Sequence, residues 1–226
     1  MIDLTPFLIS FKLAFITTLI LFIISVPIAW FLSQTNSNSK PFIEAIVAMP
    51  IVLPPSVLGF YILVTLSTNS PVGAFFDEYF DIKLVFNFTS LVIASCFYSL
   101  PFMIQPLQAG FESLNKNMIE ASYICGKNRV QTLLLVALPN IKPSIIIALI
   151  ITFAHTIGEF GVVLMVGGSI EGETKVASVA IYEMVEIMDY KMAHIYSAIM
   201  LGISFITLLF VYMFNYRYNK KLKEPT

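Results

Sequence analysis

The sequence predicts an all-α integral membrane protein of about five transmembrane helices. Hydrophobic residues make up 58% of the 226 residues and charged residues only 12%, whereas soluble domains carry about 25% charged residues. A mean hydropathy of +0.85 would leave a water-soluble fold with more apolar surface than this chain can bury. The net charge of −1 provides no basic patch, which argues against nucleic acid as a partner.

Five apolar stretches are long enough to cross a hydrocarbon core, which needs about 20 residues. In chain order they are roughly 7–32, 42–67, 89–111, 143–166 and 193–216. The second stretch contains Pro50, Pro54, Pro55 and Gly59, and proline removes a backbone donor and breaks a helix. In lipid, such a break survives only against protein or a water-lined path. We therefore expect an interior helix that lines a pathway.

Basic residues beside the spans predict the orientation, because they gather on the cytoplasmic side. With the N-terminus outside and the C-terminus in the cytoplasm, nine basic residues lie inside: Lys40, Lys116, Lys127, Arg129, Lys142, Arg217, Lys220, Lys221 and Lys223. Four lie outside: Lys12, Lys83, Lys175 and Lys191. This arrangement predicts a multi-pass protein of the plasma membrane.

Two connections on the outer side carry polar residues. The segment 69–88 mixes acidic and aromatic residues, which suits the membrane interface, and 167–192 begins with Gly167-Gly168, which predicts a loop. Part of that loop, 174–192, is also compatible with an extra amphipathic or re-entrant helix. We expect residues 1–226 to form one transmembrane domain. Because the chain lacks a GxxxxGK[ST] motif, any ATP that drives it must be bound by another chain.

The inner segment 112–142 is the longest polar interruption, yet its apolar residues have helical spacing. On one predicted face lie Leu114, Met118, Ala121 and Cys125, and on the next Val130, Leu133, Leu134 and Ala137. Gly126 between them indicates a helix end in the left-handed conformation. Two short helices bent at a glycine form a knob that can fit a groove on a soluble partner. An ordinary connector between two spans is the alternative.

The same segment resembles the EAA loop of binding-protein-dependent ABC importer permeases. The matching residues are Glu120-Ala121-Ser122, Gly126 and Val136-Ala137-Leu138-Pro139. The family pattern is EAA, three residues, Gly, nine residues, Ile, any residue and Leu-Pro, so only Ser122 and Val136 depart from it. The resemblance implies the type I ABC importer permease architecture. It also implies that residues 112–142, hereafter the coupling loop, dock into an ATP-binding subunit.

Three further stretches make the resemblance to molybdate permease subunits cover nearly the whole chain. They are MPIVLPPSVLGFYIL (49–63), AHTIGEFGVVLMVGG (154–168) and SIEGETKVASVAIYEMVE (169–186). The first two are shared with sulfate permeases, and the third favours molybdate; tungstate has almost the same size and charge as molybdate. The resemblance implies a non-enzymatic homodimer served by an extracytoplasmic oxyanion-binding protein. This chain would bind no cofactor, and the partner subunit would bind ATP and magnesium.

A doubly charged oxyanion needs a path lined by hydrogen-bond donors without strong trapping charge. Helix breaks at Pro54-Pro55 and at Gly158 to Gly161 expose backbone amides, which suit anions. The candidate pathway or gate residues are Pro54, Pro55, Ser56, Gly59, Gly158, Glu159 and Gly161. No lysine or arginine lies in mid-membrane. We therefore expect transient passage, with selection by the external binding protein.

His155 and Glu159 lie four residues apart in the fourth span, where ionisable groups are functional candidates. A zinc site needs three or four ligands, and a carboxylate repels an anion, so we favour a structural role. Glu159 would brace a bent helix, either protonated or paired with His155. An ion-coupled secondary carrier that uses this pair is an alternative, but it predicts inverted repeats, which the sequence lacks.

Overall fold

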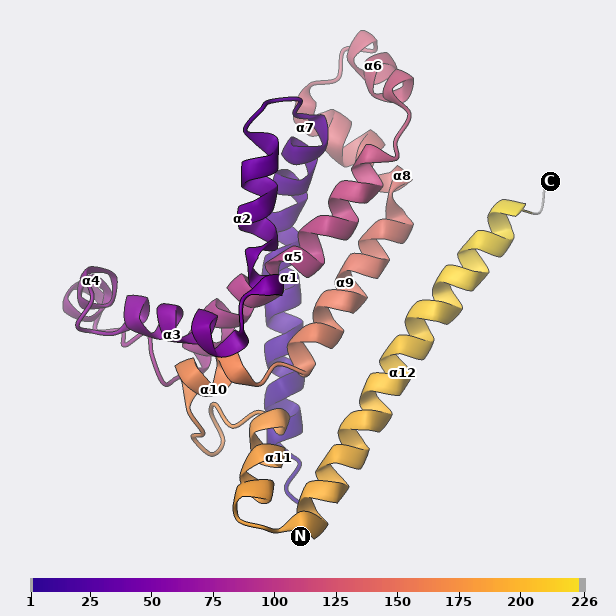
Figure 1. The fold of residues 1–226 in the computed structure, drawn as a ribbon. Helices are drawn as coiled ribbons and strands as arrows, with labels where there is room; N and C mark the ends of the chain where they lie inside the picture. The colour runs from indigo at the N-terminus through magenta and orange to yellow at the C-terminus, as the bar shows by residue number, and fades with distance from the viewer. Residues whose placement is uncertain (1, 224–226) are drawn as a thin grey trace.

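A computed structural model describes residues 2–223, and its regular structure is helical (Figure 1). The helices are α1 (Thr5–Gln34), α2 (Lys40–Val52), α3 (Pro55–Leu66), α4 (Pro71–Phe80), α5 (Phe88–Glu112), α6 (Lys116–Ile124), α7 (Arg129–Thr132), the π-helical turn η1 (Leu133–Ala137), α8 (Leu138–Asn140), α9 (Lys142–Ile157), α10 (Gly161–Gly167), α11 (Ala177–Glu186) and α12 (Tyr190–Lys223).

Three helices, α1, α5 and α12, are long and apolar enough to cross a membrane, and two bent pairs raise the number to as many as five. One pair is α2 with α3, and the other joins residues 129–140 to α9. Figure 1 shows α1, α5 and α9 as a bundle, whereas α12 approaches it near α11 and then diverges. Only 11% of the apolar window of α12 is buried, which leaves its surface to lipid or a partner.

The second predicted span is not one straight helix. The axes of α2 and α3 differ by 109°, and α3 runs sideways from the bundle toward α4 in Figure 1. The chain turns at Leu53 and Pro54, which both have extended ψ values. Because Pro54 and Pro55 have no N–H to donate, the helical ladder of α2 cannot continue through them. The helix therefore breaks at the position that the prolines predict.

The fourth predicted span, 143–166, is also divided. Helix α9 ends at Ile157, residues 158–160 are not helical, and α10 begins at Gly161. With 16 residues, α9 is about 24 Å long, slightly short of a full hydrocarbon core. Within 174–192 the structure contains the ten-residue helix α11, which is too short to cross a bilayer by itself.

A buried apolar cluster closes the end of the bundle that carries the coupling loop. It joins Trp30 of α1, Leu107 and Phe111 of α5, and Ile119 and Ala137 of the coupling loop. The Trp30 and Phe111 rings meet edge to face with their centroids 5.1 Å apart, a favoured geometry for aromatic pairs. The coupling loop is therefore packed firmly onto α1 and α5.

Candidate functional site

The bend of the coupling loop is a helix C-cap built around Gly126. The backbone N–H of Lys127 donates to the carbonyl of Ser122 at 3.1 Å, and that of Gly126 to Tyr123 at 2.9 Å. These two bonds form a Schellman motif, which requires a left-handed residue at the glycine position. Gly126 has a φ of +79°. The predicted pair of short helices with a left-handed glycine between them is confirmed.

Only part of the apolar spacing of α6 corresponds to its buried face. Ala121 and Cys125 are exposed, whereas Ile119 and Ser122 are buried. The Ser122 hydroxyl lies 2.9 Å from the Thr132 hydroxyl and donates to the Ile119 carbonyl. Because α7 packs on this side, Ile119 and Ser122 form the inward face of α6. Large apolar side chains remain exposed on the loop: Ile124, Val130, Leu134 and Leu135.

The second half of the EAA-like motif contains a π-helical turn. The N–H of Leu138 donates to Leu133, five residues earlier, immediately before Pro139. Proline has no N–H and its ring clashes with the carbonyl four residues before it, so a wider turn accommodates Pro139. Such turns are frequent at functional sites. Ala137 of this turn is fully buried and anchors the motif in the apolar cluster.

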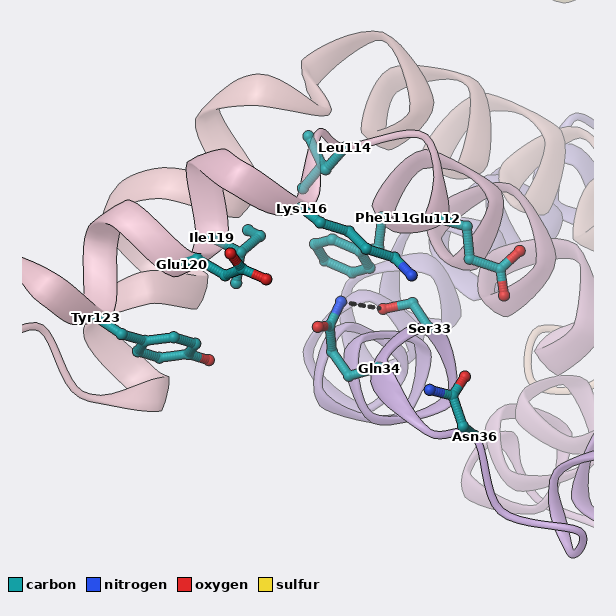
Figure 2. Close-up of a pocket in the computed structure, with 10 residues that line it drawn as sticks. All are labelled: Ser33, Gln34, Asn36, Phe111, Glu112, Leu114, Lys116, Ile119, Glu120 and Tyr123. Carbon is teal, nitrogen blue, oxygen red and sulfur yellow. Dashed lines mark hydrogen bonds between the residues drawn. The ribbon is translucent and has the colours of Figure 1, made fainter.

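A polar pocket of about 270 Å³ separates α6 from the ends of α1 and α5 (Figure 2). Lys116, Glu120 and Tyr123 line it from the α6 side, and Ser33 and Gln34 from α1. Among the described side chains, the Glu120 carboxylate has no hydrogen bond or ion pair in the structure. This acceptor therefore remains available at the edge of the coupling loop.

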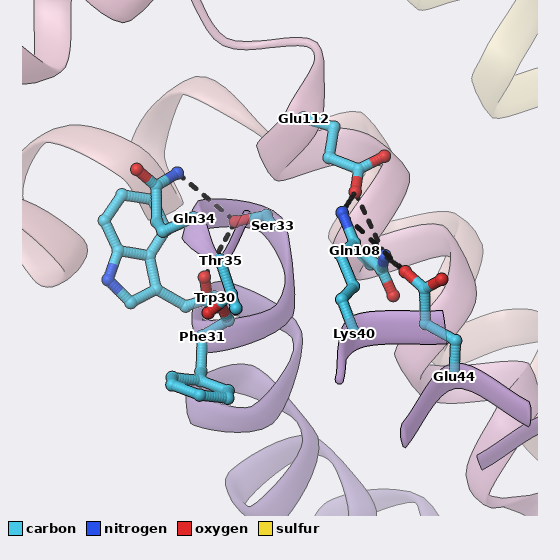
Figure 3. Close-up of polar contacts among 9 residues, drawn as sticks. All are labelled: Trp30, Phe31, Ser33, Gln34, Thr35, Lys40, Glu44, Gln108 and Glu112. Carbon is cyan, nitrogen blue, oxygen red and sulfur yellow. Dashed lines mark hydrogen bonds and ion pairs between the residues drawn. The ribbon is translucent and has the colours of Figure 1, made fainter. Parts of the chain in front are cut away.

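An ion-pair cluster fastens the start of α2 to the end of α5 (Figure 3). The Lys40 ammonium lies 2.8 Å from the Glu112 carboxylate and 3.7 Å from that of Glu44. The Gln108 amide donates to both carboxylates, at 2.6 Å to Glu44 and 3.0 Å to Glu112. The base of the coupling loop is thus connected to α2 as well as to α5.

Residues 167–192, which are predicted to lie on the outer side and are called the outer segment below, carry a second ion-pair cluster. The Lys175 ammonium contacts Glu183 of α11 at 2.5 Å and Glu171 at 3.7 Å. The hydrogen bond to Glu183 raises the pKa of Lys175 above its usual value. Burial acts to raise the pKa of Glu183, but the hydrogen bond and charge of Lys175 outweigh it and lower that pKa. The cluster ties the loop after α10 to α11.

The structure brings the two predicted pathway segments together. A Cβ on Gly161 would lie 3.0 Å from the Pro55 Cβ, and one on Gly59 would lie 2.9 Å from the Met165 Cβ. Only glycine permits so close an approach of α3 and α10. We call this contact the α3–α10 crossing. Of the remaining predicted pathway residues, Pro54, Ser56 and Gly158 are exposed, and their pathway role stays a prediction.

Glu159 differs from the other predicted residues because its side chain is fully buried, with 0% exposed. Its carboxylate accepts hydrogen bonds from Ser95 at 2.5 Å and Ser99 at 2.6 Å. Its backbone carbonyl accepts a hydrogen bond from Ser178 of α11, and His155 Nδ1 lies 3.5 Å from Glu159 Oε1. The three serines were not among the predicted residues. The spacing of Ser95 and Ser99, four residues apart in an apolar run, was the available signal.

The imidazole of His155 is held between aromatic rings. It stacks on Phe102 with ring centroids 3.9 Å apart and lies 4.7 Å from the Tyr98 ring. Its Nδ1 is 2.9 Å from the Ser99 hydroxyl. These contacts fix the ring beside Glu159, so the structure brings together the two residues whose spacing suggested a pair.

A body of apolar helices, broken near its middle and with a packed helical knob at one end, is typical of a multi-pass membrane protein (Figure 1). The chain belongs to the family of binding-protein-dependent transport system inner membrane components, whose family model matches residues 10–223. It is therefore a permease subunit of an ABC importer, located in the inner membrane.

Similar proteins include molybdenum and sulfate permeases. The molybdenum transport system permease protein ModB of Azotobacter vinelandii is 43% identical over 93% of both chains. The sulfate transport system permease protein CysT of Salmonella typhimurium is 27% identical over 92% of this chain and 75% of its own. A crystal structure of a bacterial ABC transporter involved in alginate import matches 95% of this chain and 79% of that chain, with a TM-score of 0.76 at 17% identity. That likeness confirms the ABC importer permease fold.

Proposed function

We propose that this chain forms half of the pore of a molybdate importer and moves the oxyanion by alternating access. The observation that carries this proposal is the 43% identity, over 93% of both chains, to a molybdenum permease. The sulfate permease CysT of Salmonella typhimurium reaches 27%. The GET and AIY residues of the outer segment, Gly172 to Thr174 and Ala180 to Tyr182, point the same way.

A second copy of the chain completes the pore, and a separate subunit binds ATP and magnesium. The exposed apolar side chains of the coupling loop support docking of the ATP-binding subunit, since a groove on a soluble partner would bury them. An extracytoplasmic binding protein delivers the anion; the alginate importer has been solved in complex with a periplasmic protein. When ATP closes the nucleotide-binding subunits, the two coupling loops are drawn together and the pore changes the side to which it opens.

The anion passes the exposed side of the α3–α10 crossing, where the exposed Ser56 hydroxyl is a donor. Glu159 is close in sequence, but its buried carboxylate is directed to α5 and compensated by two hydroxyl donors. Its charge therefore repels the anion less than that of an exposed carboxylate would. A path without a lysine or arginine holds the anion weakly, and selection is left to the binding protein.

Uptake of labelled molybdate by reconstituted vesicles tests the proposal. Uptake that requires ATP inside the vesicle, the ATP-binding subunit and the loaded binding protein is expected. Tungstate should compete strongly and sulfate weakly. Sulfate that competes as well as tungstate would identify a sulfate importer, for which the similarity to CysT provides a basis. Uptake that follows an ion gradient without ATP would contradict the proposal and favour a secondary carrier.

A further inference from the structure

We propose that Glu159 is a positioning residue that clamps the break between α9 and α10 to α5, so that displacement of α5 moves the α3–α10 crossing. The inference rests on the proposed function, because it assigns the path by which the coupling loop acts on the pore. The clamp consists of Glu159 together with Ser95, Ser99, His155 and Ser178.

The clamp joins α5 to the break through both carboxylate oxygens. Ser95 Oγ donates to Oε2 and Ser99 Oγ to Oε1, at 2.5 and 2.6 Å. The two serines are one helical turn apart on a single face of α5, and both are fully buried. Hydrogen bonds to a charged acceptor in an apolar interior are stronger than those between neutral groups. The two hydrogen bonds, from Ser95 and from Ser99, therefore fix the position of the Glu159 carboxylate relative to α5.

The surroundings leave Glu159 dependent on these donors. The Ser99 hydroxyl has one proton, which it donates to Glu159, so it accepts a hydrogen bond from Nδ1–H of His155 at 2.9 Å. The other ionisable groups nearby are Cys96 and Tyr98 of α5. Among the described side chains, no lysine or arginine forms an ion pair with Glu159. Without Ser95 and Ser99, the carboxylate would be poorly compensated.

The inner half of α5 connects the clamp to the coupling loop. From Ser99 to Phe111 the helix rises about 18 Å. Leu107 and Phe111 are buried in the apolar cluster with Ile119 and Ala137 of the coupling loop. The chain then continues from α5 directly into that loop. A force on the coupling loop therefore displaces α5 along with it.

Apolar packing on the other side carries the movement to the pathway. Leu91 of α5 packs with Val163 of α10, and Ala94 packs with Val162. Helix α10 in turn touches α3 where Gly161 meets Pro55. The break residues 158–160 are not helical, so the Glu159 clamp adds a polar attachment to this apolar packing and holds the break to α5 as α5 moves.

The clamp also reaches the outer segment. Ser178 of α11 donates to the backbone carbonyl of Glu159, and the N–H of Ala177 donates to Ser10 of α1 at 2.9 Å. Helix α11 is thus hydrogen-bonded both to the break and to α1. A binding protein that docks on the outer segment would act on the same residue as the coupling loop.

The test uses reconstituted vesicles with the ATP-binding subunit and loaded binding protein. It compares a double variant, in which Ser95 and Ser99 are both replaced by alanine, with the single variant Ser25→Ala. Ser25 is a matched control because it is a fully buried serine of α1 without a hydrogen-bond partner. The double variant should hydrolyse ATP nearly as fast as wild type, while uptake per ATP falls about tenfold or more, the factor expected for lost charge-assisted hydrogen bonds. Ser25→Ala should keep the wild-type ratio.

A second variant keeps the test valid if the double variant fails to insert. Adding Glu159→Leu to the two alanines removes the buried charge with its donors, a replacement that proteins tolerate better than an uncompensated charge. It should show the same loss of uptake per ATP. Equal loss of hydrolysis and uptake, or no loss of either, would overturn the clamp. Absence of ATP-dependent uptake by the wild-type protein would instead overturn the proposed function.

Discussion

Replacement of Gly126 tests the coupling loop by a perturbation whose size the structure defines. The residue has a φ of +79° and a Cβ placed on it would meet nothing within 4 Å. A side chain therefore causes no clash, and the cost comes from the left-handed backbone alone. That cost is about 1–2 kcal/mol for an ordinary residue. It should be smallest for Asn, which tolerates this conformation, and largest for β-branched Val.

A cost of this size changes a conformational equilibrium about 5- to 30-fold. In the Gly126→Val variant the Schellman bonds to Ser122 and Tyr123 would open in a corresponding fraction of molecules. The apolar surface of α6 and α7 would then be misdirected. We expect the affinity for the ATP-binding subunit to fall in the order Gly126→Asn, Gly126→Ala, Gly126→Val. Insertion into the membrane should be unaffected, since the residue lies in the exposed loop.

Titration of the ATP-binding subunit onto vesicles, followed by sedimentation, measures the effect. Gly172→Val is the matched control, because Gly172 has a φ of +76° and equally open surroundings but lies in the outer segment. The Gly172→Val variant has the same conformational strain in its backbone, and it should bind the ATP-binding subunit like wild type. If the three Gly126 variants bind like wild type, or if Gly172→Val weakens binding equally, the coupling role of the loop is refuted.

Three further predictions follow from other parts of the structure. Replacing both Pro54 and Pro55 with alanine should let α2 continue into α3 and reduce the 109° bend. Uptake should then fall, while the variant still co-purifies with the ATP-binding subunit. Normal uptake would show that the bend has no transport role. Glu183 has a lowered pKa, so its contribution to stability is present above its ordinary pKa of about 4.5 and is lost as pH falls through the lower, folded-state pKa. Hydrogen exchange in residues 169–176, corrected for the intrinsic rate, should rise in that acidic range in wild type, and Glu183→Gln should show fast exchange throughout. Single-cysteine labelling should place Ser37 and Lys220 inside and Asp77 and Glu171 outside, and labelling of Ser37 from the outer face would contradict the predicted orientation.

Features governed by local chemistry were predictable from the sequence. Pro54 and Pro55 cannot sustain a helical ladder, Gly158 begins the second break, and Gly126 occupies a left-handed C-cap. These outcomes depend on one or two residues and their neighbours. The long apolar helices α1, α5 and α12 were predictable for a similar reason, because length and composition suffice.

Features governed by long-range packing were not predictable. Helical spacing indicated that α6 has two faces, but the contact between Ser122 and Thr132 determined which face is inward. Likewise, the pair of His155 and Glu159 was visible as a spacing of four residues. Its serine partners Ser95 and Ser99 lie some 60 residues earlier in the chain, where no local pattern connects them to Glu159.

We propose that an ATP-binding subunit drives this protein through the coupling loop, and the reactivity of Cys125 measures that contact directly. Cys125 is an exposed native thiol at the tip of the loop, whereas Cys96 is partly buried within α5. The rate at which a membrane-impermeant maleimide modifies Cys125 should be measured in vesicles with the loop facing outward, with and without the ATP-binding subunit. The bound subunit should strongly protect Cys125. Equal rates in the presence of saturating subunit would contradict the proposal.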